Sequence, residues 1–178
     1  LLQAYQFGEA GRQLYDFVWS EYCDWYIEMT KVRLKSGDSA QADAARRVLV
    51  TVLDGCLKML HPFMPFVTEA IWQYLPHEGD ALIVAPWPVA GPVDEATERQ
   101  MSELMDLVRA IRNARSEYDV EPGRRIAALI SAGDRLPFIA AQREVLEFLA
   151  RLDPARVTIA SNLQQHPDKA LTLVVDGY

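Results

Sequence analysis

Apolar residues recur at intervals of three and four along the first third of the chain. In residues 3–34 this stripe contains Leu14, Val18, Tyr22, Trp25 and Met29. Such spacing places side chains on one face of an α-helix. A second, broader stripe covers residues 40–60, after a polar loop in which Asp38 or Ser39 suits the N-cap position. The pattern therefore predicts two long helices joined by a loop.

Two prolines interrupt the apolar pattern at LHPFMPFVTEAIWQYL, residues 60–75. The residue before a proline is pushed away from helical geometry, so the second helix is expected to end at His61. Pro65 suits the first turn of a third helix, where its missing N–H would have had no helical partner. We therefore expect a short, stiff and buried elbow between two core helices. The inner face of the third helix is expected to carry Val67, Ile71, Trp72 and Leu75.

The chain changes character after residue 121. Before that point, an extended segment with two prolines, LIVAPWP, is expected to lie over the surface, and a fourth helix follows over residues 94–118. Beyond Glu121-Pro122-Gly123, RIAALISA reads as a strand, LPFIAAQREVLEFLARL as a helix, and RVTIAS and ALTLVVDGY as strands. The predicted fold is mainly α: an antiparallel helical bundle over residues 1–121, followed by a small β-α-β-β subdomain of α+β type over residues 122–178.

Composition narrows the class of protein. The chain has 178 residues, of which 50% are hydrophobic and 24% charged, as in an ordinary globular protein. No apolar run approaches the roughly 18 residues that a membrane span needs, so no membrane partner is expected. A net charge of −7 argues against a general nucleic-acid-coating protein and against DNA as a partner. It leaves room for one local basic face that binds a particular RNA.

The sequence contains none of the common catalytic or cofactor-binding motifs. Its three histidines lack the spacing of a helical zinc site, and CxxC, GxGxxG, GxxxxGK[ST] and GxSxG are absent. Cys23 and Cys56 lie at apolar helical positions and are expected to be free thiols in a reducing compartment. We expect no catalytic residue, no metal and no cofactor within these 178 residues.

Positive charge is unevenly distributed. From Lys31 to Lys58, the sequence contains six basic residues and only three acidic ones. A second group, Arg109, Arg112 and Arg115, repeats every third residue and is followed by Arg124 and Arg125. Either group fits contacts to RNA phosphates, or else a solvated helix face with ion pairs, such as Asp106 with Arg109 or Arg112.

Four strings, in order, resemble the anticodon-binding region of valyl-tRNA synthetases: LYDFVWSEYCDWYIEMTKVRL, LKMLHPFMPFVTEAIWQYLP, VAPWP and IRNARSEYDVEPGRRI. The resemblance covers almost the whole chain and is weaker over the last strands. Isoleucyl and leucyl relatives share the bundle and the proline corner, and they remain the nearest alternative. The chain lacks an initiator Met and opens in a helical pattern, which indicates a piece of a longer protein.

The resemblance implies a cytoplasmic class I aminoacyl-tRNA ligase whose catalytic domain, on the same chain, uses ATP with Mg and bears the HIGH and KMSKS signatures. It also implies a further bundle helix upstream of Leu1 and a basic coiled-coil arm after Tyr178. The partner it implies is tRNA(Val). On this reading we expect contacts to tRNA phosphates from Lys31, Arg33, Arg46, Arg47 and Lys58, and an apolar contact of Leu57 with an anticodon base. A helical protein-interaction module without any RNA role is the alternative from another class.

Overall fold

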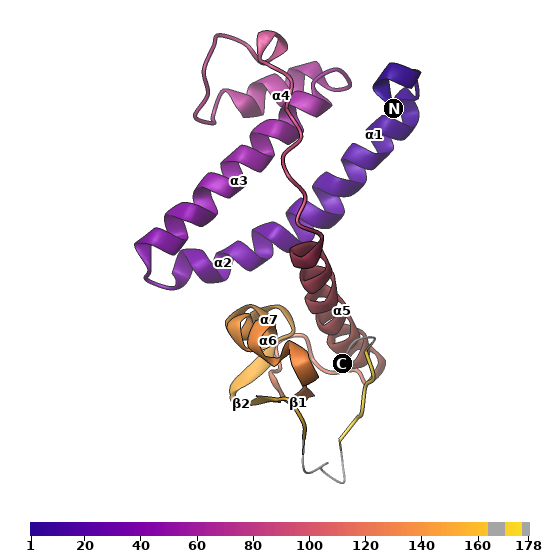
Figure 1. Cartoon of the computed structure of the whole chain (residues 1–178), viewed down its shortest axis with the longest axis vertical. Coiled ribbons are helices and arrows are strands. Elements are labelled where there is room, and N and C mark those ends of the chain that lie inside the picture. The colour runs from indigo at the N-terminus through magenta and orange to yellow at the C-terminus, as the bar shows by residue number, and fades with distance from the viewer. Residues whose placement is uncertain (164–169, 176–178) are drawn as a thin grey trace. The chain divides into compact units, whose positions relative to one another are not determined.

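The computed structural model describes residues 1–163 and 170–175, and it is mainly helical with one small sheet (Figure 1). Contacts divide the chain into two compact units, Leu1–Gly91 and Pro92–Tyr178, which are described separately below. None of the helices in the described ranges is both long enough and apolar enough to cross a membrane.

The first unit begins with the predicted long helix, which is not uniform. A single 3-10 turn, Leu2–Ala4, is followed by α1 (Phe7–Asp16), a π-helical segment η2 (Phe17–Ile27) and α2 (Glu28–Lys35). The wider π-helical turns coincide with the densest run of aromatic residues in the chain. The predicted inward stripe is confirmed for three of its members, which are buried: Tyr22, Trp25 and Met29.

The second predicted helix is α3 (Ser39–Leu60). Asp38 is its N-cap: the carboxylate accepts the backbone N–H groups of Ala40 and Gln41, at 2.9 and 3.1 Å. α3 packs along α2, and the Tyr22 hydroxyl of η2 donates to the carbonyl of Leu49, at 2.9 Å. The first and second predicted helices are therefore joined by packing and by a long-range hydrogen bond.

The predicted corner is present, with Pro65 opening α4 (Pro65–Trp72). The expectation that the elbow is buried is wrong, because Phe66 is 90% exposed and Phe63 and Met64 also face solvent. The inward face of α4 is formed by Thr68 and Trp72 instead of the full predicted set, and Val67 and Ile71 remain exposed.

Residues 76–91 follow α4, and Leu82 in this segment packs into the core of the first unit. They contain a single 3-10 turn, η3 (Leu82–Val84), and are otherwise irregular, as the prolines predict. Leu82 is buried in a core cluster with Leu57 and Trp72, while Ile83 and Val84 face outward. This segment is called the strap below.

The second unit opens with α5 (Glu95–Glu117), capped by Asp94, whose carboxylate accepts the backbone N–H groups of Ala96 and Thr97. Then follow β1 (Ile126–Ser131), a 3-10 turn (Gly133–Arg135), α6 (Leu136–Ala141), α7 (Arg143–Leu149) and β2 (Leu152–Ala160). The single helix predicted between the strands is thus two short helices that meet at Gln142.

The sheet has two parallel strands, β1 and β2, with Ile126 opposite Leu152. The register shifts between Ile126 and Ala128, where β2 carries Pro154, which has no N–H to give to the ladder. The third strand expected over residues 170–178 is not observed: residues 170–175 form no strand, and residues 176–178 lie outside the described part of the chain.

Candidate nucleic-acid interface

Four of the predicted contact residues lie near one end of a helix pair. Lys31 and Arg33 belong to α2, and Arg46 and Arg47 to the first turns of α3. The two helices meet at the short loop that joins them (Figure 1). These four side chains therefore lie on two helices that are neighbours in space. We call them the loop-side basic group.

The charges of the loop-side basic group are only weakly engaged. Lys31 pairs with Glu28, and Arg46 Nη1 lies 2.6 Å from Asp43 Oδ1, in exposed pairs one helical turn apart. Exposed pairs of this kind contribute about 0–1 kcal/mol, so a phosphate can compete for these cations. Arg47 is exposed and, within the described ranges, has no hydrogen bond or ion pair. Burial raises the pKa of Tyr26, and the nearby charge of Arg33 acts in the opposite direction.

Lys58 does not belong to the loop-side basic group. It lies about three helical turns beyond Arg47, which is about 16 Å along the axis of α3. Its side chain is 17% exposed, and Nζ pairs with Asp54 Oδ2 at 2.7 Å. Asp54 Oδ1 in turn accepts the indole N–H of Trp72, at 2.8 Å. The charge of Lys58 is thus largely neutralised within the fold.

The expected contact between Leu57 and an anticodon base is not supported by the position of this residue. Leu57 is 4% exposed and packs against Trp72 and Leu82 in the core of the first unit. The physical reason is the strap, which covers this face of α3. We therefore assign Leu57 to core packing.

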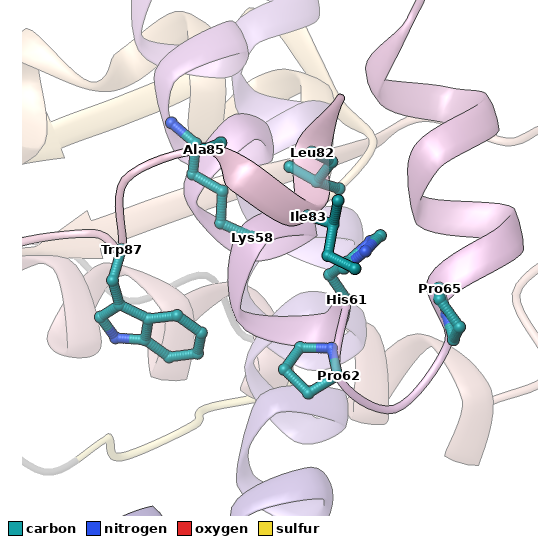
Figure 2. Close-up of a pocket in the computed structure, with 8 residues that line it drawn as sticks. All are labelled: Lys58, His61, Pro62, Pro65, Leu82, Ile83, Ala85 and Trp87. Atoms are coloured by element: carbon teal, nitrogen blue, oxygen red, sulfur yellow. The ribbon is translucent and has the colours of Figure 1, made fainter. Parts of the chain in front are cut away.

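A pocket of about 410 Å³ lies at the elbow, beside Lys58 (Figure 2). Figure 2 shows Trp87 and Pro65 at opposite sides of it, with Ile83 and His61 between them. The lining comes from the end of α3, the elbow and the strap: Lys58, His61, Pro62, Pro65, Leu82, Ile83, Ala85 and Trp87. The pocket is mostly apolar, with one cationic group and one imidazole.

Hydrogen bonds fix the imidazole and the strap at this pocket. His61 Nδ1 lies 2.8 Å from Thr68 Oγ1, and the Thr68 hydroxyl donates to the carbonyl of Met64 at 2.7 Å. Because the hydroxyl has a single hydrogen, Nδ1 must be the donor in its contact with Thr68. Glu69 holds the strap by accepting the backbone N–H of Leu82, at 2.8 Å. The side chain of Gln73 and then this N–H lower the pKa of Glu69.

Sequence reasoning missed these polar links because no local spacing marks them. Asp54 and Trp72 come from two different helices, and Glu69 reaches the strap across the turn that follows α4. His77 was also missed: its ring stacks on Trp72 with centroids 3.7 Å apart. The apolar pattern predicted that Trp72 is inward, but nothing in it indicated the partners.

The arginines of the second unit have mixed roles. Arg109 pairs with Asp106, at 2.7 Å, as the ion-pair alternative expects. Arg112 Nε donates to the carbonyl of Leu149, at 3.0 Å. Arg115 and Arg125 also donate to backbone carbonyls, so these side chains connect α5, the following loop and the sheet.

The described residues contain no group of three or more His, Cys, Asp or Glu side chains that could hold a metal ion. Both cysteines are free thiols. Burial, followed by the proximity of Cys23, raises the pKa of the Cys56 thiol to about 11. This thiol is therefore protonated and weakly nucleophilic near neutral pH.

The sequence of residues 1–130 matches the family described as the anticodon-binding domain of tRNA ligase. This chain belongs to that family. This match and the valine–tRNA ligases described next confirm the resemblance that the four sequence strings indicated.

Three similar proteins are valine–tRNA ligases. The protein of Geobacillus stearothermophilus is 45% identical over 180 residues, and that of Bacillus cereus (strain ATCC 14579) 42% identical over 179; each alignment covers 99% of this chain and 20% of the relative. The protein of Staphylococcus aureus (strain JH9) is 39% identical over 177 residues, or 98% of this chain. The chain thus spans about one fifth of the length of these relatives.

Proposed function

We propose that this chain is the part of a valine–tRNA ligase that binds tRNA(Val) near the anticodon. The observation that carries the proposal is the match of residues 1–130 to the anticodon-binding family, together with valine–tRNA ligases that align over nearly the whole chain. The parent protein attaches valine to tRNA with ATP and Mg, at a catalytic domain on the same chain and in the cytoplasm. We propose no cofactor site within residues 1–178 themselves.

Within this portion, residues 1–121 form the anticodon-binding helical bundle of antiparallel type, and residues 122–178 the small α+β subdomain. An anticodon must be held at a fixed, long distance from the site where the amino acid is attached. Close-packed interiors resist deformation, so the core around Leu57, Trp72 and Leu82 suits a rigid support. The prolines of the exposed elbow restrict the backbone between α3 and α4, and so limit the angles that these two helices can adopt.

Contacts to tRNA phosphates come from the loop-side basic group: Lys31, Arg33, Arg46 and Arg47. These side chains lie on adjacent elements and have at most exposed, weak carboxylate partners. Lys58 is a lesser candidate, because Asp54 already neutralises it. No DNA or membrane partner is proposed.

The proposal is tested by aminoacylation with the full-length protein that carries this chain. We expect tRNA(Val) to be charged with valine, and isoleucine or leucine to be charged far more weakly onto their own tRNAs. Preferential charging of isoleucine or leucine would assign the chain to one of those related ligases. An absence of charging with all three amino acids, alongside salt-insensitive binding of a protein partner, would favour an interaction module.

A further inference from the structure

Five arginines from three segments converge at one edge of the small sheet. β1 and β2 are parallel and begin at the same edge, because Ile126 lies opposite Leu152 and its N–H donates to the carbonyl of Arg151, at 3.3 Å. Arg125 and Arg151, which directly precede these two strands, therefore lie at that edge. We call the group the arginine edge; its members are Arg112, Arg115, Arg124, Arg125 and Arg151.

Hydrogen bonds to neutral carbonyls hold the arginine edge together. Arg115 Nη2 donates to the carbonyl of Arg124 at 2.9 Å, and Arg125 Nη1 to that of Leu152 at 3.0 Å. Arg112 Nε reaches the carbonyl of Leu149, two residues before Arg151. For Arg115 and Arg125, such acceptors fix the guanidinium group in place without cancelling its charge.

This arrangement differs from that of five arginines elsewhere in the chain. Five pair with a carboxylate at 2.6 or 2.7 Å: Arg12, Arg46, Arg109, Arg135 and Arg143. In the part of the chain that the structure describes, no carboxylate pairs with Arg115, Arg124, Arg125 or Arg151. This holds although three exposed acidic residues lie at the end of α5 and in the loop that joins α5 to β1: Glu117, Asp119 and Glu121.

Arg115 carries a buried positive charge that no carboxylate of the described residues pairs with. It is 8% exposed, and its Nη1 is buried with no acceptor within the described ranges. Removing a charge from water without an opposite charge raises the free energy of the folded state, so an anion near this edge would lower it. Arg124 and Arg151 are exposed and lie where such an anion can approach.

The ligand class follows from these side chains. Guanidinium groups bind phosphate oxygens through paired N–H donors, and several adjacent groups match a row of phosphates. Tyr118, at the end of α5, is 63% exposed beside the same loop and offers a ring on which an unpaired base can stack. Arginines interleaved with an exposed aromatic ring favour RNA over an acidic peptide.

We propose that the arginine edge is a second RNA-binding site, at which Arg124, Arg125 and Arg151 contact backbone phosphates of the tRNA. The site belongs to the second unit and is separate from the loop-side basic group. This inference rests on the proposed function, since it takes tRNA to be the ligand. Arg115 has a structural role, holding the loop that carries Arg124.

The test is filter binding of a tRNA(Val) transcript to the full-length protein, with the dissociation constant measured over a range of salt concentrations. The variant is the double substitution Arg124→Gln and Arg151→Asn; Asn is chosen because residue 151 has φ 55, a left-handed conformation that Asn tolerates. The matched control is Arg99→Gln, also on the surface of the second unit but about 20 Å along α5 from Arg112. Thermal unfolding verifies that each variant folds.

We expect the double variant to bind about three- to tenfold more weakly at low salt, with the slope of log K against log salt reduced by about 1.5. Arg99→Gln is expected to leave both quantities unchanged, and Arg124→Lys to retain most of the binding. If the wild type binds tRNA and the double variant matches it, the arginine edge is not a site, while the proposed function stands. If the wild type does not bind tRNA at all, the inference and the proposed function both fail.

Discussion

The indole N–H of Trp72 donates to the carboxylate of Asp54, at 2.8 Å, and so joins α4 to α3. The same carboxylate pairs with Lys58, and Trp72 is almost completely buried. A hydrogen bond to a charged acceptor is among the stronger polar contacts in a protein. This link fixes the direction in which α4 leaves the elbow, which packing of the exposed elbow residues cannot do.

Removing either partner of this link should destabilise the first unit. We expect Asp54→Ala to lower the free energy of unfolding by about 2 kcal/mol, because the buried indole N–H loses its acceptor. Trp72→Phe should also destabilise, and the double variant should show a coupling free energy of about 1 kcal/mol or more. Urea denaturation of the wild type, the two single variants and the double variant gives this double-mutant cycle. Simple additivity of the two effects would show that the contact contributes nothing to stability.

The sequence left two candidates for the N-cap of α3, Asp38 and Ser39, and the structure assigns the cap to Asp38. Asp38→Ala should lower the free energy of unfolding by about 1 kcal/mol, since two backbone N–H groups lose their acceptor. The neighbouring Ser39→Ala is the control and should change it by less than about 0.5 kcal/mol, because Ser39 is already inside the helix. Denaturant titrations compare the two, and a larger effect at Ser39 would contradict the observed cap.

Stability in alkaline solution should depend on Cys56. Burial raises the pKa of its thiol from 9.0 to about 11, so the folded state retains this proton over a range in which the unfolded state has released it. The stabilisation by this group is therefore complete below about pH 9 and is lost as the pH rises from 9 to 11 and beyond.

The measurement is the free energy of unfolding at several pH values for the wild type and for Cys56→Ala. The wild type should lose more stability than the variant between pH 9 and 11, although the variant is less stable near neutrality because of the cavity it creates. Parallel curves for the two proteins would show that the buried thiol does not titrate as described.

Much of the helical structure could be predicted, because it depends on local spacing. The stripe from Leu14 to Met29, the Asp38 cap and the position of Pro65 at the start of α4 are all set by residues near in sequence. What failed depends on distant packing. Phe66 is exposed although the apolar pattern placed the elbow in the core, and Leu82 of the strap packs on Leu57, a contact that no periodicity in α3 predicts.

The candidate site was predictable only in part, for the same reason. Charge counts drew attention to Arg46 and Arg47, and the loop joining α2 to α3 keeps them near Lys31. They also included Lys58, which the helix carries about 16 Å away. The arginine edge requires the pairing of Ile126 with Leu152, a long-range register that the sequence does not show.

The central claim, that the loop-side basic group holds tRNA, is tested most directly by filter binding of tRNA(Val) to the full-length protein. The variant is Arg46→Gln with Arg47→Gln, and the control removes two charges elsewhere, by Arg12→Gln with Arg99→Gln. We predict that the variant binds about tenfold more weakly and that its salt slope falls by about 1.5, while the control behaves as the wild type. Equal affinity and equal slope for variant and wild type would contradict the claim.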